Sequence, residues 1–381
     1  MNTKWTMALL LAGAMTMTAC DKKEAATSDS PKTDEGAASK TPPPEVKTPK
    51  GIEDPSNDAK VVELAKAALA CEWKSGRPDH KCDEAKEWRK ADELKKGAAD
   101  KTLVNFLADP KPEVRWLGAT ALKSNGKSYR EDSAMATAVI AAVNAEKDVS
   151  IAPVMGDAVA KIDGEKSGQL AALKSLITDH PLDEVRAAAV GGFLFHNRSD
   201  ANFDFVAGIT KTDKNDKVRL AASKSFWVGN PSNKKDAVCK LWLELASDKD
   251  KDVAGHSAYH ASFFPHGGGC TTEWDALLTL IEGKAKEGKV ASSFTSSALK
   301  YLYSQKKSTP EQKAKAMAVA EVLALETKNE KTARSSALRF IGETDPKAKK
   351  LATKLKDDKE FFVKSTAKDI LEGNIKLKDK K

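Results

Sequence analysis

Apolar and polar positions repeat along this chain with a period of about three dozen residues, starting near Lys60. In each copy, a stretch with helical spacing of apolar residues ends in a short acidic turn. An aliphatic or small residue then opens a second helical stretch. The successive spacings of these anchor residues are 35, 36, 33, 35, 37, 43 and 30 residues, which argues against chance. The anchors are Val114, Val149, Val185, Val218, Val253, Val290, Ala333 and Val363.

Three of the turns have closely similar sequences, each with an acidic residue shortly before a Val-Arg pair. The acidic residue can cap the second helix and interact with its positive end. The valine is expected to enter the core between hairpins, and the arginine can reach the turn acid of its own or a neighbouring repeat. A single hairpin cannot bury its apolar face, so the hairpins are expected to stack. The turns are Asp109-Pro110 to Glu113-Val114-Arg115, His180-Pro181 to Glu184-Val185-Arg186, and Lys214 to Asp216 followed by Val218-Arg219.

These residues also carry a family resemblance. The pattern Leu107, Asp109-Pro110, Val114-Arg115, Ala119, Leu122, echoed by Asp183, Val185-Arg186, Ala189, resembles the HEAT-repeat family over about residues 100–372. The resemblance implies an all-α fold, namely a right-handed α-solenoid of about eight stacked helical hairpins with an extended binding surface. A tetratricopeptide array has a similar period, but its Trp-Leu-Gly-Tyr pattern is absent. Residues 60–99 are expected to form an N-terminal capping helical hairpin, and residues 373–381 a basic tail.

The N-terminal segment has the pattern of a processing signal. Lys4 precedes an apolar run over residues 6–18, which is too short to span a bilayer as a helix. The sequence Met17-Thr18-Ala19-Cys20 resembles the lipobox of bacterial lipoproteins. The resemblance implies that residues 1–19 are a signal peptide and that Cys20 carries a lipid that anchors the protein to a membrane of the cell envelope. The alternative is an ordinary secretory signal, but no better small-x-small cleavage site follows.

Residues 20–59 are expected to form a disordered tether rich in Pro, Lys and Glu. They contain six prolines and no aromatic residue, and Val46 and Ile52 are their only large aliphatic residues. Such a segment cannot bury enough apolar surface to offset the entropy lost on ordering. We expect the tether to hold the folded part at a distance from the membrane, on the periplasmic side of either the inner or the outer membrane.

The other four cysteines predict two disulfides, because an exported protein folds in an oxidising compartment. Cys71 and Cys82 flank a turn between two predicted helices, so we expect Cys71–Cys82 to staple the capping hairpin. Cys239 lies in the first helix of one repeat and Cys270 just before the first helix of the next, which favours Cys239–Cys270. Four reduced thiols would be expected only in a cytosolic protein.

One short stretch suggests metal chemistry. His256 and His260 are four residues apart and so share a helical face, and His266 and Cys270 follow in a glycine-rich loop. Imidazole and thiolate are ligands for zinc or copper. The spacing matches no known zinc motif, and a disulfide at Cys270 would remove its thiolate. Polar packing of the histidines, or a ligand-facing patch with Tyr259, Phe263 and Phe264, are the alternatives to a metal site.

The absence of known catalytic motifs excludes several classes of enzyme. The sequence contains no Gly-x-Ser-x-Gly, P-loop or His-Glu-x-x-His motif, so we expect no enzyme and no required cofactor. The formal charge of +8 suits an acidic partner, but export argues against nucleic acid. The leading hypothesis is a non-catalytic, membrane-anchored scaffold that binds another envelope protein or a peptide. The alternatives are a metal-binding lipoprotein that uses the histidines and a structural envelope spacer.

Overall fold

The computed structural model describes residues 51–229, 234–263 and 270–377. The described helices belong to one compact unit. The signal peptide, the lipidation site Cys20, most of the predicted tether and His266 lie outside the described residues. Of the described helices, none combines the length and the apolar character needed to cross a bilayer.

The fold is all-α, as the sequence predicts. Short 3-10 helices cover Gly51–Glu53 (η1), Asp92–Lys95 (η2) and Ser128–Arg130 (η3), and one antiparallel pair of strands joins β1 (Trp73–Lys74) to β2 (Arg77–Pro78). The α-helices of the described part are α1 (Ala59–Leu69), α2 (Asp83–Lys90), α3 (Ala99–Phe106), α4 (Pro112–Asn125), α5 (Ser133–Ala145), α6 (Ala152–Val159), α7 (Leu170–Asp179), α8 (Asp183–His196), α9 (Asp200–Thr212), α10 (Asp216–Gly229), α11 (Lys235–Leu245), α12 (Lys251–Ser262), α13 (Trp274–Lys286), α14 (Ser293–Ser304), α15 (Pro310–Leu325), α16 (Lys331–Thr344), α17 (Ala348–Leu355) and α18 (Phe361–Leu371).

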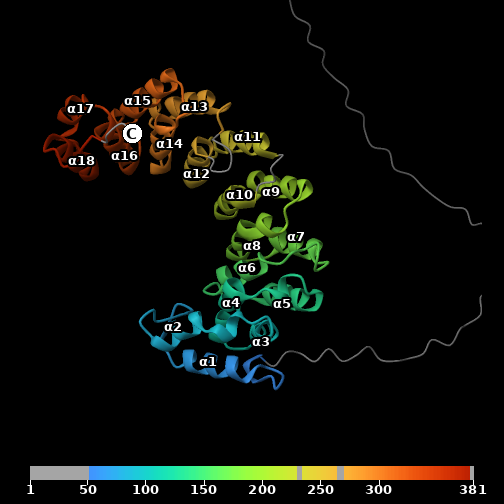
Figure 1. Cartoon of the computed structure of the whole chain (residues 1–381). Coiled ribbons are helices and arrows are strands. Elements are labelled where there is room, and N and C mark those ends of the chain that lie inside the picture. Colours follow the sequence, from blue (N-terminus) through green and yellow to red (C-terminus); the bar gives the residue numbers. More distant parts are fainter. Residues whose placement is uncertain (1–50, 230–233, 264–269, 378–381) are drawn as a thin grey trace, which may run out of the picture. The chain divides into compact units, whose positions relative to one another are not determined.

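Helix contacts follow the order of the sequence (Figure 1). From α3 onward, each odd-numbered helix contacts the even-numbered helix that follows it. The even-numbered helices also contact one another in succession, from α4 and α6 through to α16 and α18. Each hairpin therefore packs mainly on its neighbours in sequence, and residues one repeat apart come together along the even-numbered helices.

The anchors of the repeat are mostly buried. Val114, Val185, Val218, Val253, Ala333 and Val363 are fully buried, and Val290 is 3% exposed. Val149 is the exception, because it lies in the turn before α6 and is 59% exposed. The expectation that Val149 enters the core is wrong. Pro153 lies in the first turn of α6, which begins at Ala152, and the buried residues there are Ile151 and Ala152.

Close approach of neighbouring even-numbered helices depends on glycine at two positions. A Cβ atom on Gly156 of α6 would lie 2.7 Å from the carbonyl oxygen of Val185 on α8. A Cβ atom on Gly229 of α10 would lie 2.4 Å from the Cβ of Leu194 on α8. The helix backbones can approach this closely because neither glycine has a side chain.

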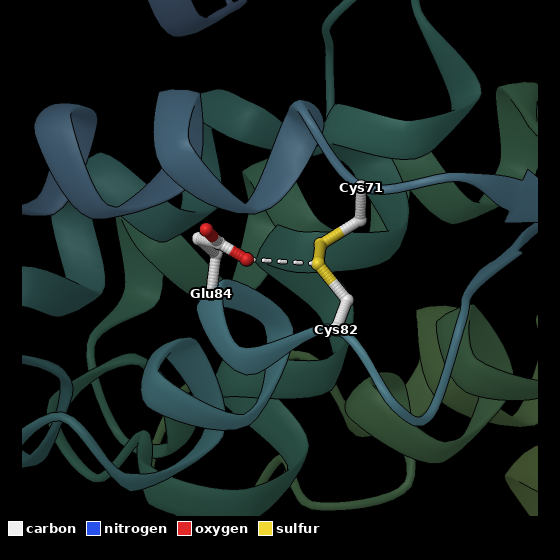
Figure 2. Close-up of side chains that lie close together, drawn as sticks. All are labelled: Cys71, Cys82 and Glu84. Carbon is white, nitrogen blue, oxygen red and sulfur yellow. Dashed lines mark hydrogen bonds between the residues drawn. A yellow bond between two sulfur atoms is a disulfide. The ribbon is translucent and has the colours of Figure 1, made fainter.

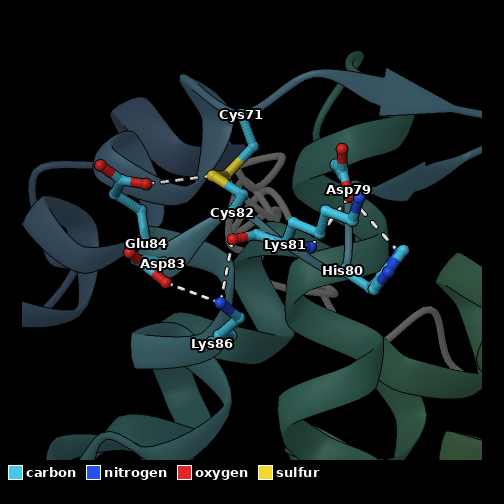
Figure 3. The surroundings of a disulfide bond; sticks show 8 residues. All are labelled: Cys71, Asp79, His80, Lys81, Cys82, Asp83, Glu84 and Lys86. Atoms are coloured by element: carbon cyan, nitrogen blue, oxygen red, sulfur yellow. Dashed lines mark hydrogen bonds and ion pairs between the residues drawn. A yellow bond between two sulfur atoms is a disulfide. The ribbon is translucent and has the colours of Figure 1, made fainter.

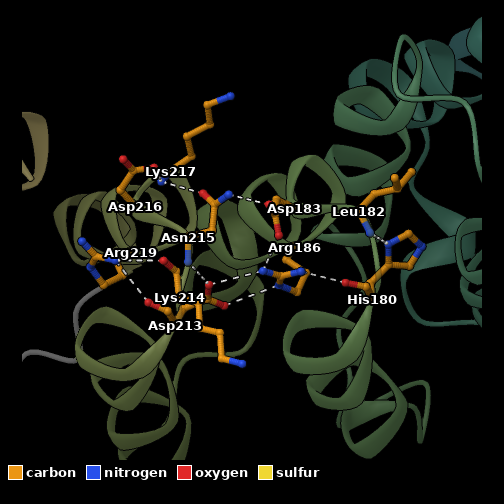
Figure 4. A network of polar contacts seen from close by, with 10 residues as sticks. All are labelled: His180, Leu182, Asp183, Arg186, Asp213, Lys214, Asn215, Asp216, Lys217 and Arg219. Carbon is orange, nitrogen blue, oxygen red and sulfur yellow. Dashed lines mark hydrogen bonds and ion pairs between the residues drawn. The ribbon is translucent and has the colours of Figure 1, made fainter.

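Arginines at the start of the even-numbered helices bind acidic residues of the next hairpin. Arg186 on α8 binds Asp213, and Arg219 on α10 binds Asp248 with an Nη2–Oδ1 distance of 3.0 Å. Each guanidinium also donates to a carbonyl six residues earlier: Arg186 donates to His180, and Arg219 donates to Asp213 (Figure 4). The turn of one hairpin is thereby joined both to its own helix and to the turn of the next. Arg115 repeats the arrangement with Glu146 and the Asp109 carbonyl. Arg334 binds Asp358 in the same way, but it donates to the Ala324 carbonyl, ten residues earlier.

The N-terminal end differs from the prediction at its boundary. Helices α1 and α2 pack together in the region expected to form the capping hairpin. Residues 51–58, which the sequence assigns to the tether, are ordered against α3. Ile52 is 8% exposed and its backbone N–H donates to Asp109 Oδ2 at 2.8 Å, and Asp58 caps α1. Because this segment is mostly polar, its composition did not predict that Ile52 would be buried.

Candidate functional site

The first disulfide joins Cys71, just after α1, to Cys82, the residue that precedes α2, with a Cα–Cα distance of 6.0 Å (Figure 2). A carboxylate oxygen of Glu84 lies 3.0 Å from the sulfur of Cys82. Lys86 donates to Asp83 at 2.6 Å and to the Lys81 carbonyl at 2.9 Å (Figure 3). The Cys71–Cys82 disulfide therefore closes the turn that contains β1 and β2, as the sequence predicts.

The second disulfide joins successive hairpins. Cys239 of α11 pairs with Cys270, with a Cα–Cα distance of 5.3 Å, and both residues are about 1% exposed. Trp274, four residues after Cys270, donates from its indole nitrogen to the Ala261 carbonyl of α12 at 3.1 Å. This second predicted pairing is also present, and it fixes the start of α13 beside α11 and α12.

The structure does not assemble the histidines into a metal-ligand group within its described part. Two groups of three candidate ligands occur there: Cys71 with Cys82 and Glu84, and Cys239 with Cys270 and Glu273. In each group the two sulfurs are bonded to one another, so neither offers a thiolate. His256 and His260 belong to neither group, and His266 lies outside the described residues.

His256 and His260 instead belong to an aromatic cluster. They lie on one face of α12 with ring centroids 6.1 Å apart. The ring of His256 is 3.7 Å from that of Phe294 on α14, centroid to centroid. His260 is 7% exposed and lies between Trp227 and Trp242, at 4.7 and 5.1 Å. The packing alternative for these two residues is therefore the one that the contacts support.

Burial keeps both imidazoles neutral. Burial, together with the nearby charges of His256 and Lys224, lowers the pKa of His260 to about 3. Burial and the positive charge of Lys224 lower the pKa of His256 to about 4, against the opposing effect of Asp252. A neutral imidazole has one donor and one acceptor nitrogen, so each ring can form a hydrogen bond of either kind.

A pocket of about 560 Å³ opens beside this cluster, between side chains of α10, α12 and α14. Helical spacing explains its walls, because residues three, four or seven apart share one face of a helix. On α14 the face comprises Phe294, Ser297, Tyr301 and Ser304. The full lining is Lys224, His256, Tyr259, His260, Phe294, Ser297, Lys300, Tyr301 and Ser304.

The aromatic walls support one another. Tyr259 meets Tyr301 edge to face at 5.3 Å and Phe294 at 5.9 Å, and Phe263 stacks on Tyr301 at 4.7 Å. Burial and a hydrogen bond with Tyr301 raise the pKa of Tyr259 to about 12. The phenol of Tyr259 therefore stays neutral at physiological pH, and the rings of Tyr259, Tyr301 and Phe263 form an apolar surface.

The two lysines of the pocket differ in their pairing. Lys300 binds Glu343 of α16 at 2.9 Å. Lys224 forms no hydrogen bond or ion pair with the described residues, and burial lowers its pKa, against the effect of the negative charge of Asp252. None of the residues that line the pocket is acidic. The pocket therefore presents one ammonium group that is open to an anion.

The sequence located part of this site. Its ligand-facing patch alternative names Tyr259 and Phe263, which do lie here, whereas Phe264 is outside the described residues. It missed Lys224 and Tyr301, which come from the neighbouring helices α10 and α14. Residues at equivalent positions of successive repeats lie next to one another on adjacent even-numbered helices. An alignment of the repeats with one another would therefore have identified Lys224 and Tyr301.

No family model and no curated protein matches this sequence. Among solved structures, the chain is similar to a crystal structure of an engineered protein, with 16% sequence identity and a TM-score of 0.33. The similarity covers 81% of this chain and 93% of that one. A similarity at this level supports no argument about function.

Proposed function

We propose that this chain is a lipid-anchored protein of the bacterial cell envelope, whose HEAT-like repeats form a non-catalytic scaffold for a protein or peptide. In this proposal, α3 to α18 make eight helical hairpins of a right-handed α-solenoid, with α1 and α2 as the N-terminal cap. The succession of contacts along the even-numbered helices supports the repeat arrangement. The lipobox-like sequence that ends in Cys20 supports the anchor.

The observation that supports binding is the pocket on α10, α12 and α14. It combines stacked aromatic rings, an unpaired ammonium group and a volume of about 560 Å³, which is typical of binding sites for small molecules or short peptide segments. It lies on the even-numbered helices, where successive hairpins present one continuous surface of the kind that helical repeats use for partners.

Site-specific photo-crosslinking in the intact envelope tests this function. A photoreactive phenylalanine analogue would replace Ser304, which is exposed and lines the pocket. The matched control would carry the analogue at Lys240, which is exposed on α11. We expect a discrete crosslinked species from position 304 and none from position 240. Equal crosslinking at both positions, or none at position 304, would contradict a binding surface here.

A further inference from the structure

The pocket between α10, α12 and α14 has polar groups that its own surroundings leave unpaired. His260 is 7% exposed, and its Nδ1 has no hydrogen-bond partner among the described residues. Buried polar atoms are nearly always hydrogen-bonded, so this nitrogen is an exception in the wall of the pocket. Lys224 adds an exposed ammonium group that forms no ion pair or hydrogen bond with the described residues, although the negative charge of Asp252 acts on it.

The serines of the pocket specify hydrogen-bond direction. Ser304 donates its hydroxyl hydrogen to the Tyr301 carbonyl at 3.0 Å, and Ser297 donates to the Ser293 carbonyl at 3.3 Å. Each hydroxyl oxygen therefore keeps its lone pairs for an incoming donor. The pocket thus offers acceptors at Ser297 and Ser304, a cation at Lys224 and aromatic surface at Phe294 and Tyr301.

We propose that this pocket binds the C-terminal residue of a peptide or protein whose last side chain is aromatic or large and aliphatic. The inference rests on the proposed peptide-binding function and names its ligand. A C-terminal residue carries a carboxylate, an amide N–H and its side chain within one residue, which matches the three kinds of group that the pocket presents together. The carboxylate binds Lys224, the amide N–H donates to a serine hydroxyl, and the side chain packs on the aromatic walls.

Binding of fluorescent tetrapeptides to the full-length protein in detergent micelles tests the inference. The probes are Gly-Gly-Ala-Phe with a free carboxylate, the same peptide as the C-terminal amide, and Gly-Gly-Ala-Ala with a free carboxylate. A fourth probe, Gly-Asp-Phe-Gly amide, carries its carboxylate internally. We expect the first to bind at least about tenfold more tightly than each of the others, since a charge-assisted hydrogen bond or a buried ring contributes at least that factor.

Substitution of the cation links binding to this pocket. Lys224→Gln is expected to weaken the free-acid phenylalanine peptide by about tenfold and to leave the amide unchanged. Lys217→Gln, an equal charge change at an exposed position of the same helix, is expected to leave both affinities unchanged. Equal binding of the acid and the amide, equal binding of the internal aspartate peptide, or insensitivity to Lys224→Gln would overturn the inference. Crosslinking at position 304 without binding of these peptides would overturn it while leaving the proposed function standing.

Discussion

The guanidinium of Arg219 on α10 binds the carboxylate of Asp248, which follows α11, across a distance of 3.0 Å. Arg219 is 4% exposed, and the pair joins the turns of two successive hairpins. Removing one member leaves the other charge largely buried without its partner. Arg219→Met is therefore expected to lower the free energy of unfolding by about 3 kcal/mol, measured by urea denaturation.

An exposed pair provides the control for this prediction. Lys211 and Glu244 also join neighbouring hairpins, but both side chains are about half exposed. Lys211→Met is expected to change the free energy of unfolding by less than about 1 kcal/mol. Similar losses for Lys211→Met and Arg219→Met would show that burial does not set the contribution of these links.

Two glycine substitutions are expected to act in opposite directions. Gly156→Ala places a Cβ 2.7 Å from the Val185 carbonyl oxygen and should destabilise the fold by about 1–3 kcal/mol. Gly208 lies within α9 and has open space around it, so Gly208→Ala should stabilise the fold by about 0.5–1 kcal/mol through helix propensity. Thermal unfolding of the two variants measures both effects, and a stabilised Gly156→Ala would refute close packing of α6 on α8.

The two disulfides are expected to contribute unequally. The Cys71–Cys82 bond spans 11 residues and the Cys239–Cys270 bond spans 31. The chain-entropy relation gives about 3 kcal/mol for the shorter loop and about 4 kcal/mol for the longer one. Replacing each pair by alanines and measuring urea denaturation compares them. A larger loss from the Cys71–Cys82 pair would contradict the loop-length argument.

Acid should destabilise the protein through its buried histidines. Burial lowers the pKa of His260 to about 3, whereas an unfolded histidine titrates near 6.5. Between these two pH values the unfolded chain binds more protons than the folded one. The free energy of unfolding is therefore not reduced by His260 above about pH 6.5, and it falls as the pH drops below that value.

The contribution of His260 can be isolated by substitution. Its effect should amount to about 2 kcal/mol between pH 7 and pH 5. His260→Phe keeps an aromatic ring between Trp227 and Trp242 and should remove this part of the pH dependence, measured by urea denaturation at both values. An unchanged pH dependence would show that His260 gains its proton as readily in the folded state as in the unfolded chain.

Lipid attachment at Cys20 is testable directly. Cys20→Ser should abolish incorporation of an alkyne-labelled fatty acid and shift the protein from the membrane fraction to the soluble fraction, because the anchoring acyl chains are absent. The Cys71→Ala/Cys82→Ala variant serves as the control and should remain labelled. Labelling that persists in Cys20→Ser would contradict the proposed lipid attachment at Cys20.

The all-α fold could be predicted because the same sequence pattern recurs along the chain. Acidic turns, buried valines and following arginines recur, and the structure shows that Arg115, Arg219 and Arg334 each bind an acid of the next hairpin. Arg186 binds both its own Asp183 and the next hairpin's Asp213, so the sequence alone could not choose between the two.

The sequence predictions failed where a feature occurs at one place in the chain and not in every repeat. A proline in the first turn of α6 moved the helix start past Val149, although the spacing of the anchors suggested otherwise. The sequence alone could not predict the pocket, because Lys224, His256 and Tyr301 come together only when three successive even-numbered helices pack against one another. Spacing within α12 identified one wall, while the other walls lie a repeat away in each direction.

The locality of the helix contacts also determines where the chain opens first. Interior hairpins have a neighbour on both sides, whereas α17 and α18 have one, and Phe361 of α18 is 74% exposed. Amide hydrogens of α17 and α18 should therefore exchange faster than those of the interior hairpins. Fraying of the last hairpin would leave the helices around His260 folded, so the pocket between α10, α12 and α14 would keep its walls.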